Sequence, residues 1–209
     1  MARSLSVAVA VLASGAVGLT AAGVARAAPP GNLSVGVERL FGISRVTQEV
    51  EAGDATFSST DTSISLFSPV FSGRRGYSTP RLAFDYLGSS SVTFGGAFAY
   101  ETISGDGGDD RSSWLLAARL GYFARPSADF GVWPRGGLTH LTYVEVEGPG
   151  DDPSATALTI EVPLVFLVLG HSVGLTFMPY ADIGIAGGTD DIDQTMTEVG
   201  LQFGLNAFF

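Results

Sequence analysis

Most of the chain alternates between apolar residues and small or polar residues, with a period of two. The last segment shows this clearly, because the odd positions from Thr197 to Phe209 are mostly apolar and the even positions from Glu198 to Asn206 are small or polar. This period is typical of β-strands whose two faces meet different surroundings. Clusters of Gly, Asp, Ser or Pro interrupt the alternation at regular intervals. The pattern predicts an all-β chain.

Counting strands back from the C-terminus gives eight. The expected strands are residues 31–45, 78–88, 91–103, 113–124, 129–146, 156–168, 172–187 and 196–209. Each is at least as long as the ~9–11 residues that a tilted transmembrane strand needs. A further β-like stretch, residues 63–67, would break the even parity that closes an antiparallel ring, so we place it in a long first outer loop, residues 46–77. A count of ten requires only that one long strand be split.

The breaks between strands fall into two length classes. Short breaks lie at residues 88–90, 125–128 and 170–171, and longer ones lie at residues 104–112, 147–154 and 188–194. Short turns that alternate with long loops are typical of a transmembrane β-barrel, whose turns face the periplasm and whose loops face outward. After residue 28, the longest apolar stretch, Val162 to Gly170, is too short for a membrane-spanning helix and contains Pro163.

The polar positions distinguish a membrane barrel from a soluble sandwich. Strand faces in water normally carry long charged and hydroxyl residues, whereas here the polar positions are rich in Gly and Ala with single charges between them. Small residues and pairable charges suit a narrow interior, and an arginine facing lipid would cost about 2–4 kcal/mol near the bilayer midplane. We therefore expect apolar side chains outside and a charged network in the lumen. Its expected members are Glu38, Arg81, Asp85, Glu101, Arg119, Arg135, Glu161, Asp182 and Glu198.

Three arginines face six acids in this network, so pairing would leave three acids over. A structural plug is one interpretation, and a narrow pore that prefers cations is the other, because surplus carboxylates favour positive ions. Arg39 shares its phase with Val37 and Phe41, which predicts a β-bulge beside Glu38 or a position near the rim. Trp133 falls on the inward phase and is expected to plug the inner end. Aromatic residues at strand ends are expected to form interfacial girdles: Tyr86, Tyr100, Trp114, Tyr122, Phe130 and Phe209.

Composition narrows the possible functions. The 209 residues include no cysteine and 28 glycines, with a mean hydropathy of +0.30 and a formal charge of −10. The lack of cysteine excludes a disulfide scaffold and a cysteine-ligated metal centre. All eleven basic residues are arginines and face twenty-one acids, so nucleic-acid binding is not expected.

The N-terminus has the pattern of a cleaved secretory signal peptide. Arg3 precedes an apolar run from Leu5 to Val24, and Ala25-Arg26-Ala27 forms an A-x-A sequence of small residues. We expect residues 1–27 to be removed during export, which leaves residues 28–209 as one barrel domain with no internal repeat or linker.

The alternating final strand, which ends on Phe209, is similar to the recognition sequence of bacterial outer-membrane barrels. With the signal peptide and the turn and loop lengths, the mature chain resembles the small eight-stranded barrels of the OmpA transmembrane domain and OmpX type. The resemblance implies a closed antiparallel up-and-down barrel in the outer membrane, in contact with lipid and lipopolysaccharide. It also implies that Phe209 is read by the barrel-assembly machinery and that side chains pack the lumen shut.

Other candidate chemistry is weak. The acidic pairs Asp109-Asp110, Asp151-Asp152 and Asp190-Asp191 do not match the spacing of a calcium loop, so we expect no metal site and no cofactor. Of the two histidines, His140 has no evident serine partner in the sequence, and His171, next to Ser172, lies in an inner turn on the wrong side for outer-leaflet lipid, so we expect no catalytic residues.

The expected function is structural or interactive: membrane integrity, adhesion or a minor narrow pore. One alternative is a soluble periplasmic barrel that binds a small ligand or lipid, as lipocalins do. A less favoured alternative is a barrel enzyme that modifies lipids.

Overall fold

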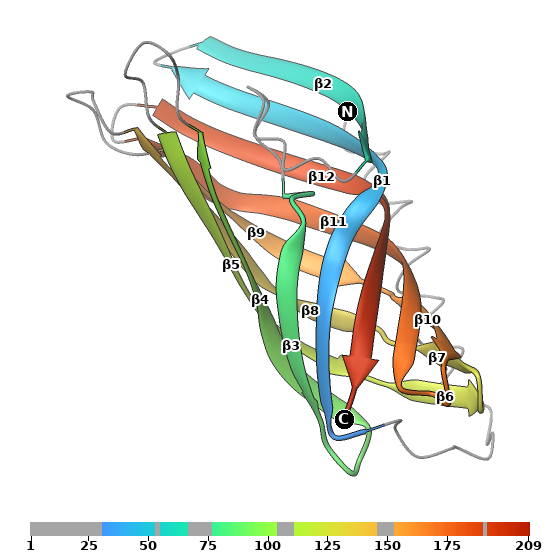
Figure 1. Cartoon of the computed structure of the whole chain (residues 1–209). Coiled ribbons are helices and arrows are strands. Elements are labelled where there is room, and N and C mark those ends of the chain that lie inside the picture. Colours follow the sequence, from blue (N-terminus) through green and yellow to red (C-terminus); the bar gives the residue numbers. More distant parts are fainter. Residues whose placement is uncertain (1–30, 53–54, 67–76, 104–110, 146–152, 190–191) are drawn as a thin grey trace.

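The computed structural model describes residues 31–52, 55–66, 77–103, 111–145, 153–189 and 192–209. Within these ranges, twelve strands form one antiparallel sheet (Figure 1). None of the described residues forms a helix with the length and apolar character that a membrane span requires. The expected signal peptide and the acidic pairs of the outer loops lie outside the described residues.

The strands are β1 (Leu33–Ala52), β2 (Ala55–Leu66), β3 (Arg81–Leu87), β4 (Val92–Ile103), β5 (Arg111–Tyr122), β6 (Ala124–Ser127), β7 (Phe130–Val132), β8 (Arg135–Glu145), β9 (Ser154–Glu161), β10 (Leu164–Val168), β11 (Val173–Thr189) and β12 (Ile192–Phe208).

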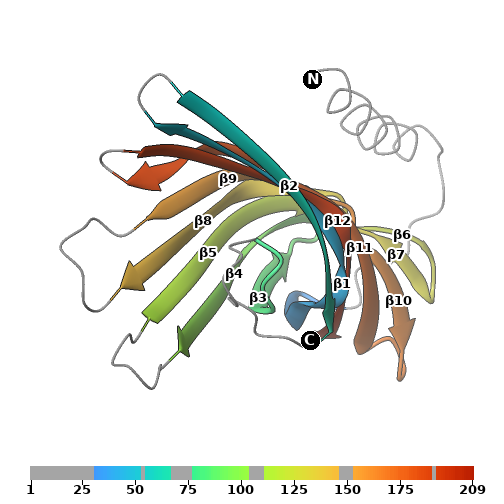
Figure 2. The ribbon, with the colours of Figure 1, turned by 90° about the horizontal axis from the view of Figure 1, so that it is seen from above.

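Eight strands form the barrel wall. They follow the order β12-β1-β3-β4-β5-β8-β9-β11, and β11 pairs back onto β12 to close the ring (Figure 2). The short strands β6, β7 and β10 continue β5, β8 and β9 toward the end of the barrel that carries the short turns, which we name the turn end. The opposite end is named the loop end. Closure pairs the strand edges that an open sheet would expose, and the prediction of an eight-stranded antiparallel barrel is confirmed.

Two of the predicted strands are interrupted by proline. The wall strand expected at 129–146 breaks between β7 and β8 at Trp133-Pro134, and the one expected at 156–168 breaks between β9 and β10 at Val162-Pro163. Proline has no N–H group to donate, so it cannot complete the ladder at these positions. The short turn expected at 125–128 is also shifted, because β6 occupies most of it and the turn lies at residues 128–129.

The prediction of a long first outer loop at residues 46–77 is wrong. β1 continues to Ala52 and pairs with β2 along Phe41–Ala52, so residues 55–66 form an additional strand outside the ring of eight. β2 carries serine and threonine at many positions and has little apolar alternation, so the sequence pattern shows only the β-like stretch at residues 63–67. The loop expected at 188–194 is likewise short, because Thr189 pairs with Ile192.

The predicted bulge in β1 is present. The pairing of β1 with β12 shifts between Val37 and Phe41, and Arg39 adopts a positive φ of 56°. The extra residue lets Glu38 and Arg39, adjacent in sequence, both be buried, at 2% and 0% exposure. The bulge also marks a change of neighbour, because β1 pairs with β3 before it and with β2 after it.

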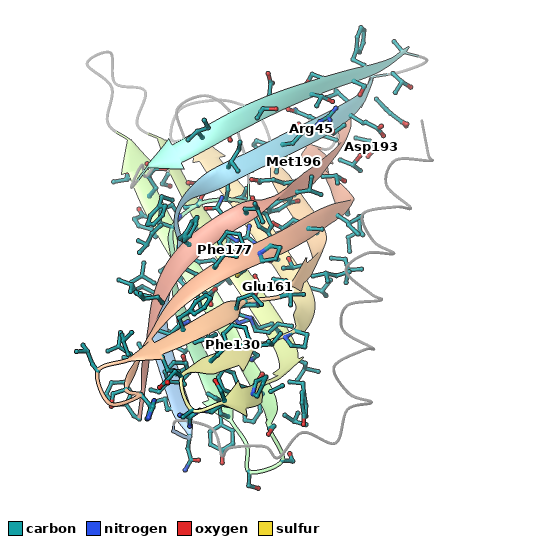
Figure 3. The ribbon with its side chains drawn as sticks, turned by 90° about the vertical axis from the view of Figure 1, so that its right-hand side faces the viewer. Arg45, Phe130, Glu161, Phe177, Asp193 and Met196 are labelled. Carbon is teal, nitrogen blue, oxygen red and sulfur yellow. The ribbon has the colours of Figure 1, made fainter. Side chains whose placement is uncertain are left out.

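Apolar side chains cover the outside of the barrel (Figure 3). On β3, Leu82, Phe84 and Tyr86 are 46–51% exposed, whereas the intervening Ala83 and Asp85 are almost fully buried. Of the expected girdle residues, Tyr86, Tyr100 and Phe209 are exposed, and Trp114, Tyr122 and Phe130 are partly exposed. The alternation is therefore inside-out with respect to a soluble protein.

The lumen contains two apolar clusters, one toward each end. The cluster in the loop half consists of Tyr77, Ala99, Leu115, Leu141, Ala155, Ala157 and Met196. The cluster at the turn end consists of Leu87, Phe123, Trp133, Val165, Leu167 and Phe208. We name the second cluster the aromatic layer. Charged side chains fill the space between the two.

The charged cluster in the lumen

Six charged residues from five wall strands meet in the middle of the lumen. They are Glu38 on β1, Arg81 and Asp85 on β3, Arg119 on β5, Arg135 on β8 and Glu161 on β9, and none is more than 6% exposed. Glycines make room for them, because a Cβ atom at Gly121 would lie 2.7 Å from Cγ of Arg135. We name these six residues the central cluster.

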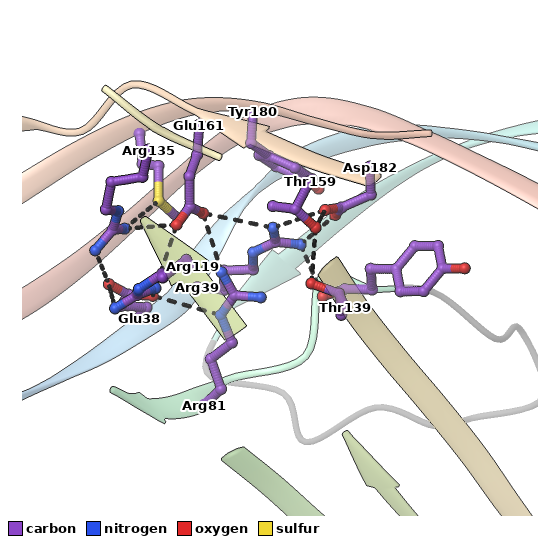
Figure 4. A network of polar contacts seen from close by, with 12 residues as sticks. Glu38, Arg39, Arg81, Arg119, Arg135, Thr139, Thr159, Glu161, Tyr180 and Asp182 are labelled. Carbon is purple, nitrogen blue, oxygen red and sulfur yellow. Dashed lines mark hydrogen bonds and ion pairs between the residues drawn. The ribbon is translucent and has the colours of Figure 1, made fainter. Parts of the chain in front are cut away.

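Arg119 lies at the centre of the central cluster (Figure 4). Its guanidinium donates to both oxygens of Glu38, at 2.6 and 3.0 Å, and to both oxygens of Asp85. A further bond of 3.2 Å reaches Glu161. Bidentate arginine–carboxylate pairs combine charge with a fixed planar geometry, so Arg119 joins three strands that come from distant parts of the chain.

Arg135 and Arg81 complete the central cluster. Arg135 lies 2.9 Å from both Glu38 and Glu161, and its guanidinium carbon lies 4.5 Å from the ring centre of Trp133. Arg81 donates to Glu161 at 3.0 Å. Arg81 also lies 3.4 Å from Glu38, so each glutamate contacts all three arginines of the central cluster, which compensates for the removal of its charge from water.

Arg39 forms a second group next to the central cluster. It donates to Asp182 at 2.6 Å and to the carbonyl oxygen of Tyr77 at 2.8 Å, and it lies 4.0 Å from the ring centre of Tyr180. Its guanidinium is also 3.7 Å from Glu161, which connects the two groups. Sequence reasoning placed Arg39 only at a bulge or the rim, because its phase matched that of the apolar residues.

Glu198 is held by a hydroxyl and a backbone N–H group. Its carboxylate accepts from the hydroxyl of Tyr180 at 2.7 Å and from the backbone N–H of Tyr77 at 2.7 Å. Tyr77 itself is fully buried and lies four residues before β3 begins. No periodic signal marks Tyr77, because it precedes the strand.

The charge balance differs from the one expected. With Arg39 included, four arginines meet Glu38, Asp85, Glu161, Asp182 and Glu198. The formal charge of this set is −1 if all nine groups are ionised, whereas the sequence predicted a surplus of three acids. Glu101 lies on β4 six residues beyond Gly95, which pairs with Asp85, and it is only half-buried.

The two histidines contact residues outside the central cluster. His140 contacts Thr156 at 2.9 Å and Thr142 at 3.0 Å, and its ring lies 5.4 Å from that of Trp114. His171 lies in a turn at the turn end, 3.4 Å from Asp129. Among the described residues, no group of three or more His, Cys, Asp or Glu side chains is arranged to hold a metal ion.

A closed antiparallel ring, an apolar exterior and a charged interior together define a transmembrane β-barrel of the outer-membrane type. The exterior decides against the soluble lipocalin-like alternative, because a soluble barrel directs its apolar face inward. Here Leu175 is 48% exposed and Phe203 is 36% exposed, while Arg119 and Arg135 are buried. The inverted pattern predicted from the sequence is confirmed.

No protein-family model matches the sequence, and no curated protein matches it. Solved structures with a similar fold include Neisserial surface protein A, with 10% identity and a TM-score of 0.49 over 86% of this chain and 98% of that chain. Outer membrane protein OprG from Pseudomonas aeruginosa has 12% identity and a TM-score of 0.46 over 86% and 99%. The outer membrane protease OmpT from Escherichia coli has 9% identity and a TM-score of 0.45 over 88% and 98%.

Proposed function

We propose that this protein is a sealed structural barrel of the outer membrane that presents its loop end to the cell surface. Its roles are to contribute to membrane integrity and to interact with molecules outside the cell, rather than to conduct solutes. The apolar band of the barrel contacts lipid and lipopolysaccharide.

The observation that supports sealing is the succession of packed layers along the lumen. The aromatic layer occupies the turn end, where Phe123 and Trp133 pack edge to face with ring centres 5.4 Å apart. The central cluster follows, with its arginines tied to carboxylates on opposite walls. An ion that crossed would have to separate these charge pairs and pass between the rings, and eight strands leave only enough room for side chains.

Conductance across a planar lipid bilayer tests this proposal. We expect the purified full-length protein to produce no current steps in 1 M KCl, while a porin reconstituted in parallel produces them. Regular steps from the wild-type protein would overturn the sealed barrel and support the cation-selective pore.

Surface interaction is supported by the extension of β1 and β2 at the loop end. β1 has 20 residues, about twice the length that a transmembrane strand needs. Its second half and β2 therefore project beyond the hydrocarbon, with Phe57 and Ile64 on β2 63% and 73% exposed. We expect an epitope inserted between β1 and β2 to be detected on intact cells, and detection only after the outer membrane is permeabilised would contradict the proposed orientation.

A non-enzymatic role is part of the proposal. His140 is bound by two threonines, and His171 with Asp129 lies at the turn end, away from the outer leaflet. A lipid-modifying enzyme would need a base paired with a nucleophile. Purified protein is expected to leave phospholipid and lipid A unchanged, and an activity lost in His140→Ala or His171→Ala would contradict this.

Phe209 is proposed as the signal for the assembly machinery. Its side chain is 71% exposed at the turn end, while its backbone N–H donates to Leu33 at 2.9 Å. We expect Phe209→Ala to lower the amount of assembled protein in cells and to leave refolding in detergent unchanged. Equal losses in both assays would show that the ring only stabilises the barrel.

A further inference from the structure

One histidine lies on the outward face of the barrel wall, among residues that face lipid. His140 on β8 is two residues beyond Leu138, which is 51% exposed. The flanking Thr139 and Leu141 are fully buried, so His140 shares the outward phase of Leu138 and is itself partly exposed. Among the described residues at outward positions of β4, β5, β8 and β9, there is no Asp, Glu, Lys or Arg. His140 is therefore the side chain that can bring a positive charge to this part of the exterior.

The row of the wall that contains His140 marks the edge of the apolar band. Toward the loop end, the next outward row contains Tyr100, Trp114 and Thr142, which pair in register across β4, β5 and β8. Tyr100 is 61% exposed and Trp114 is partly exposed, as expected for an aromatic girdle at the level of the lipid headgroups. Toward the turn end, the wall continues with aliphatic residues such as Leu138. His140 therefore lies at the border between hydrocarbon and headgroups.

Two threonines hold the imidazole of His140 by both of its nitrogen atoms. Nδ1 lies 2.9 Å from Oγ1 of Thr156 on β9, and Nε2 lies 3.0 Å from Oγ1 of Thr142. The indole ring of Trp114 lies 5.4 Å from the imidazole, measured between ring centres. Because indole rings attract cations at separations up to about 6 Å, these surroundings accommodate a protonated imidazole.

Protonation of His140 changes what the two threonines offer. A neutral imidazole has one donor and one acceptor nitrogen, so one of the two hydroxyls must donate its proton to the ring. In the protonated ring both nitrogens donate, and both hydroxyl oxygens accept. Both O–H groups can then donate to a further ligand beside a positive charge. Two donors next to a cation suit the anionic oxygens of a phosphate, which form short and strong charge-assisted hydrogen bonds.

The position of the site identifies the source of the phosphate. The outward face of β5, β8 and β9 is continuous with the apolar wall, so the molecules in contact with it are membrane lipids. Headgroups occupy roughly 5–8 Å beyond each side of the hydrocarbon. One outward row corresponds to about 6.7 Å along a strand. The rows of His140 and Trp114 together therefore cover the depth at which headgroup phosphates lie.

We propose that His140, together with Thr142 and Thr156, binds the phosphate of an outer-leaflet lipid headgroup when its imidazole is protonated. The inference rests on the proposed function only for the choice of leaflet, because the loop end faces outward in that proposal. The site adds to the apolar band a specific lipid contact, which strengthens as the medium becomes acidic.

Methyl NMR of the full-length protein in lipid nanodiscs tests this proposal. The probe is phosphatidylglycerol in a phosphatidylcholine bilayer, because its phosphodiester carries one negative charge throughout the range in which histidine changes charge, about pH 5 to 8. We expect the methyl shifts of Thr142 and Thr156 to saturate as the fraction of phosphatidylglycerol rises. Half-saturation is expected to need about fivefold less of this lipid at about pH 5 than at about pH 8, because a charge-assisted hydrogen bond is about twice as strong as a neutral one.

Two histidine variants separate the site from other effects of pH. His140→Gln keeps a hydrogen-bonding side chain without the charge and is expected to remove the pH dependence. His171→Gln is the matched control, because His171 lies in a turn at the turn end, and it is expected to keep the pH dependence. The methyls of Thr47 and Thr60 are the control signals, because their hydroxyls lie 3.2 Å apart without a histidine between them, and their response to the lipid is expected to be the same at both pH values.

A second variant keeps the test available if His140→Gln does not fold. Thr142→Val preserves the shape of the side chain and removes one of the two donors. The methyl of Thr156 is then expected to need several-fold more phosphatidylglycerol for half-saturation at about pH 5 than it needs in the wild type. An unchanged half-saturation in Thr142→Val would count against the site.

Three further results would overturn the site. One is an equal response of the wild type at both pH values, and another is a pH dependence that persists in His140→Gln. The third is that inorganic phosphate causes the same shifts in phosphatidylcholine alone, which would assign the site to a free anion. Nanodiscs carry the same lipids in both leaflets, so a barrel whose loop end faced the periplasm would refute the proposed function and leave the phosphate site intact.

Discussion

At the scale of single residues, Arg119 is the side chain on which the lumen most depends. It binds Glu38 and Asp85 through paired hydrogen bonds and also reaches Glu161. Removing one partner from a buried ionic group leaves uncompensated charge behind, and this is far more costly than losing a pair at the surface.

We expect Arg119→Met to lower the free energy of unfolding by about 3–5 kcal/mol. The reason is that two carboxylates would lose their bidentate partner in a site without bulk water. Urea unfolding in lipid vesicles, followed by tryptophan fluorescence, measures the change.

The exposed Arg45 on β1 provides a matched control, because Arg45→Met removes the same charge from the surface and is expected to change stability by less than about 0.5 kcal/mol. Equal effects of the two substitutions would show that the central cluster contributes no more than a surface charge.

At the scale of elements, β1 illustrates what the sequence can and cannot reveal. Its alternation up to Val37 is regular, and the change of phase at Arg39 predicts the bulge correctly. The inward direction of Arg39 depends on its left-handed backbone, with a φ of 56°, which period-two reasoning does not capture. The partners Asp182 and Tyr77 come from distant parts of the chain, so only the closed ring brings them to Arg39.

β2 was predicted only in part, as the β-like stretch 63–67 within a loop, for a different reason. Serine and threonine fill most of its positions, so neither face carries an apolar row that a period-two pattern would reveal. In contrast, the wall strands must place apolar groups toward lipid, and their alternation was sufficient to predict eight of them. The lumen residues on those strands all occupy inward positions of the alternation. The alternation alone does not show that Arg119 contacts Glu38 and that Glu101 lies outside the central cluster.

The distinction between β2 and the wall leads to a prediction on lipid-facing positions. Leu116 on β5 and Phe57 on β2 are 49% and 63% exposed, yet Leu116 lies among apolar neighbours of the wall and Phe57 lies beyond them. Leu116→Arg is expected to lower the free energy of unfolding in lipid vesicles by about 2–4 kcal/mol, because the charge would face hydrocarbon.

Phe57→Arg is the control and is expected to have little effect in the same urea titration. Comparable losses for both variants would mean that β2 also lies in the membrane.

At the scale of the whole molecule, closure of the ring accounts for both the exterior and the contents of the lumen. Because β11 pairs with β12 and β12 pairs with β1, no strand edge stays unpaired where the first and last wall strands meet. The interior is then too narrow for anything but side chains and small ligands. We expect a closed barrel of this kind to resist unfolding by detergent until it is heated.

We therefore expect heat-modifiable migration on gels. Protein solubilised in SDS without boiling should run as a compact form, and boiling should shift it to the position expected for the mass of the unfolded mature chain. Identical migration before and after boiling would contradict a closed barrel.

The central claim is that apolar side chains face lipid while the lumen is packed and isolated, and the chain's two tryptophans report on the two environments. Trp114 is partly exposed on the outward face of β5, and Trp133 is fully buried in the aromatic layer. Trp133→Phe and Trp114→Phe each leave one reporter in place.

The decisive measurement is tryptophan quenching in vesicles of lipids with brominated acyl chains. We expect strong quenching of Trp114 in Trp133→Phe and little quenching of Trp133 in Trp114→Phe. Strong quenching of Trp133, with Trp114 unaffected by the lipid and quenched instead by aqueous iodide, would contradict the inside-out barrel.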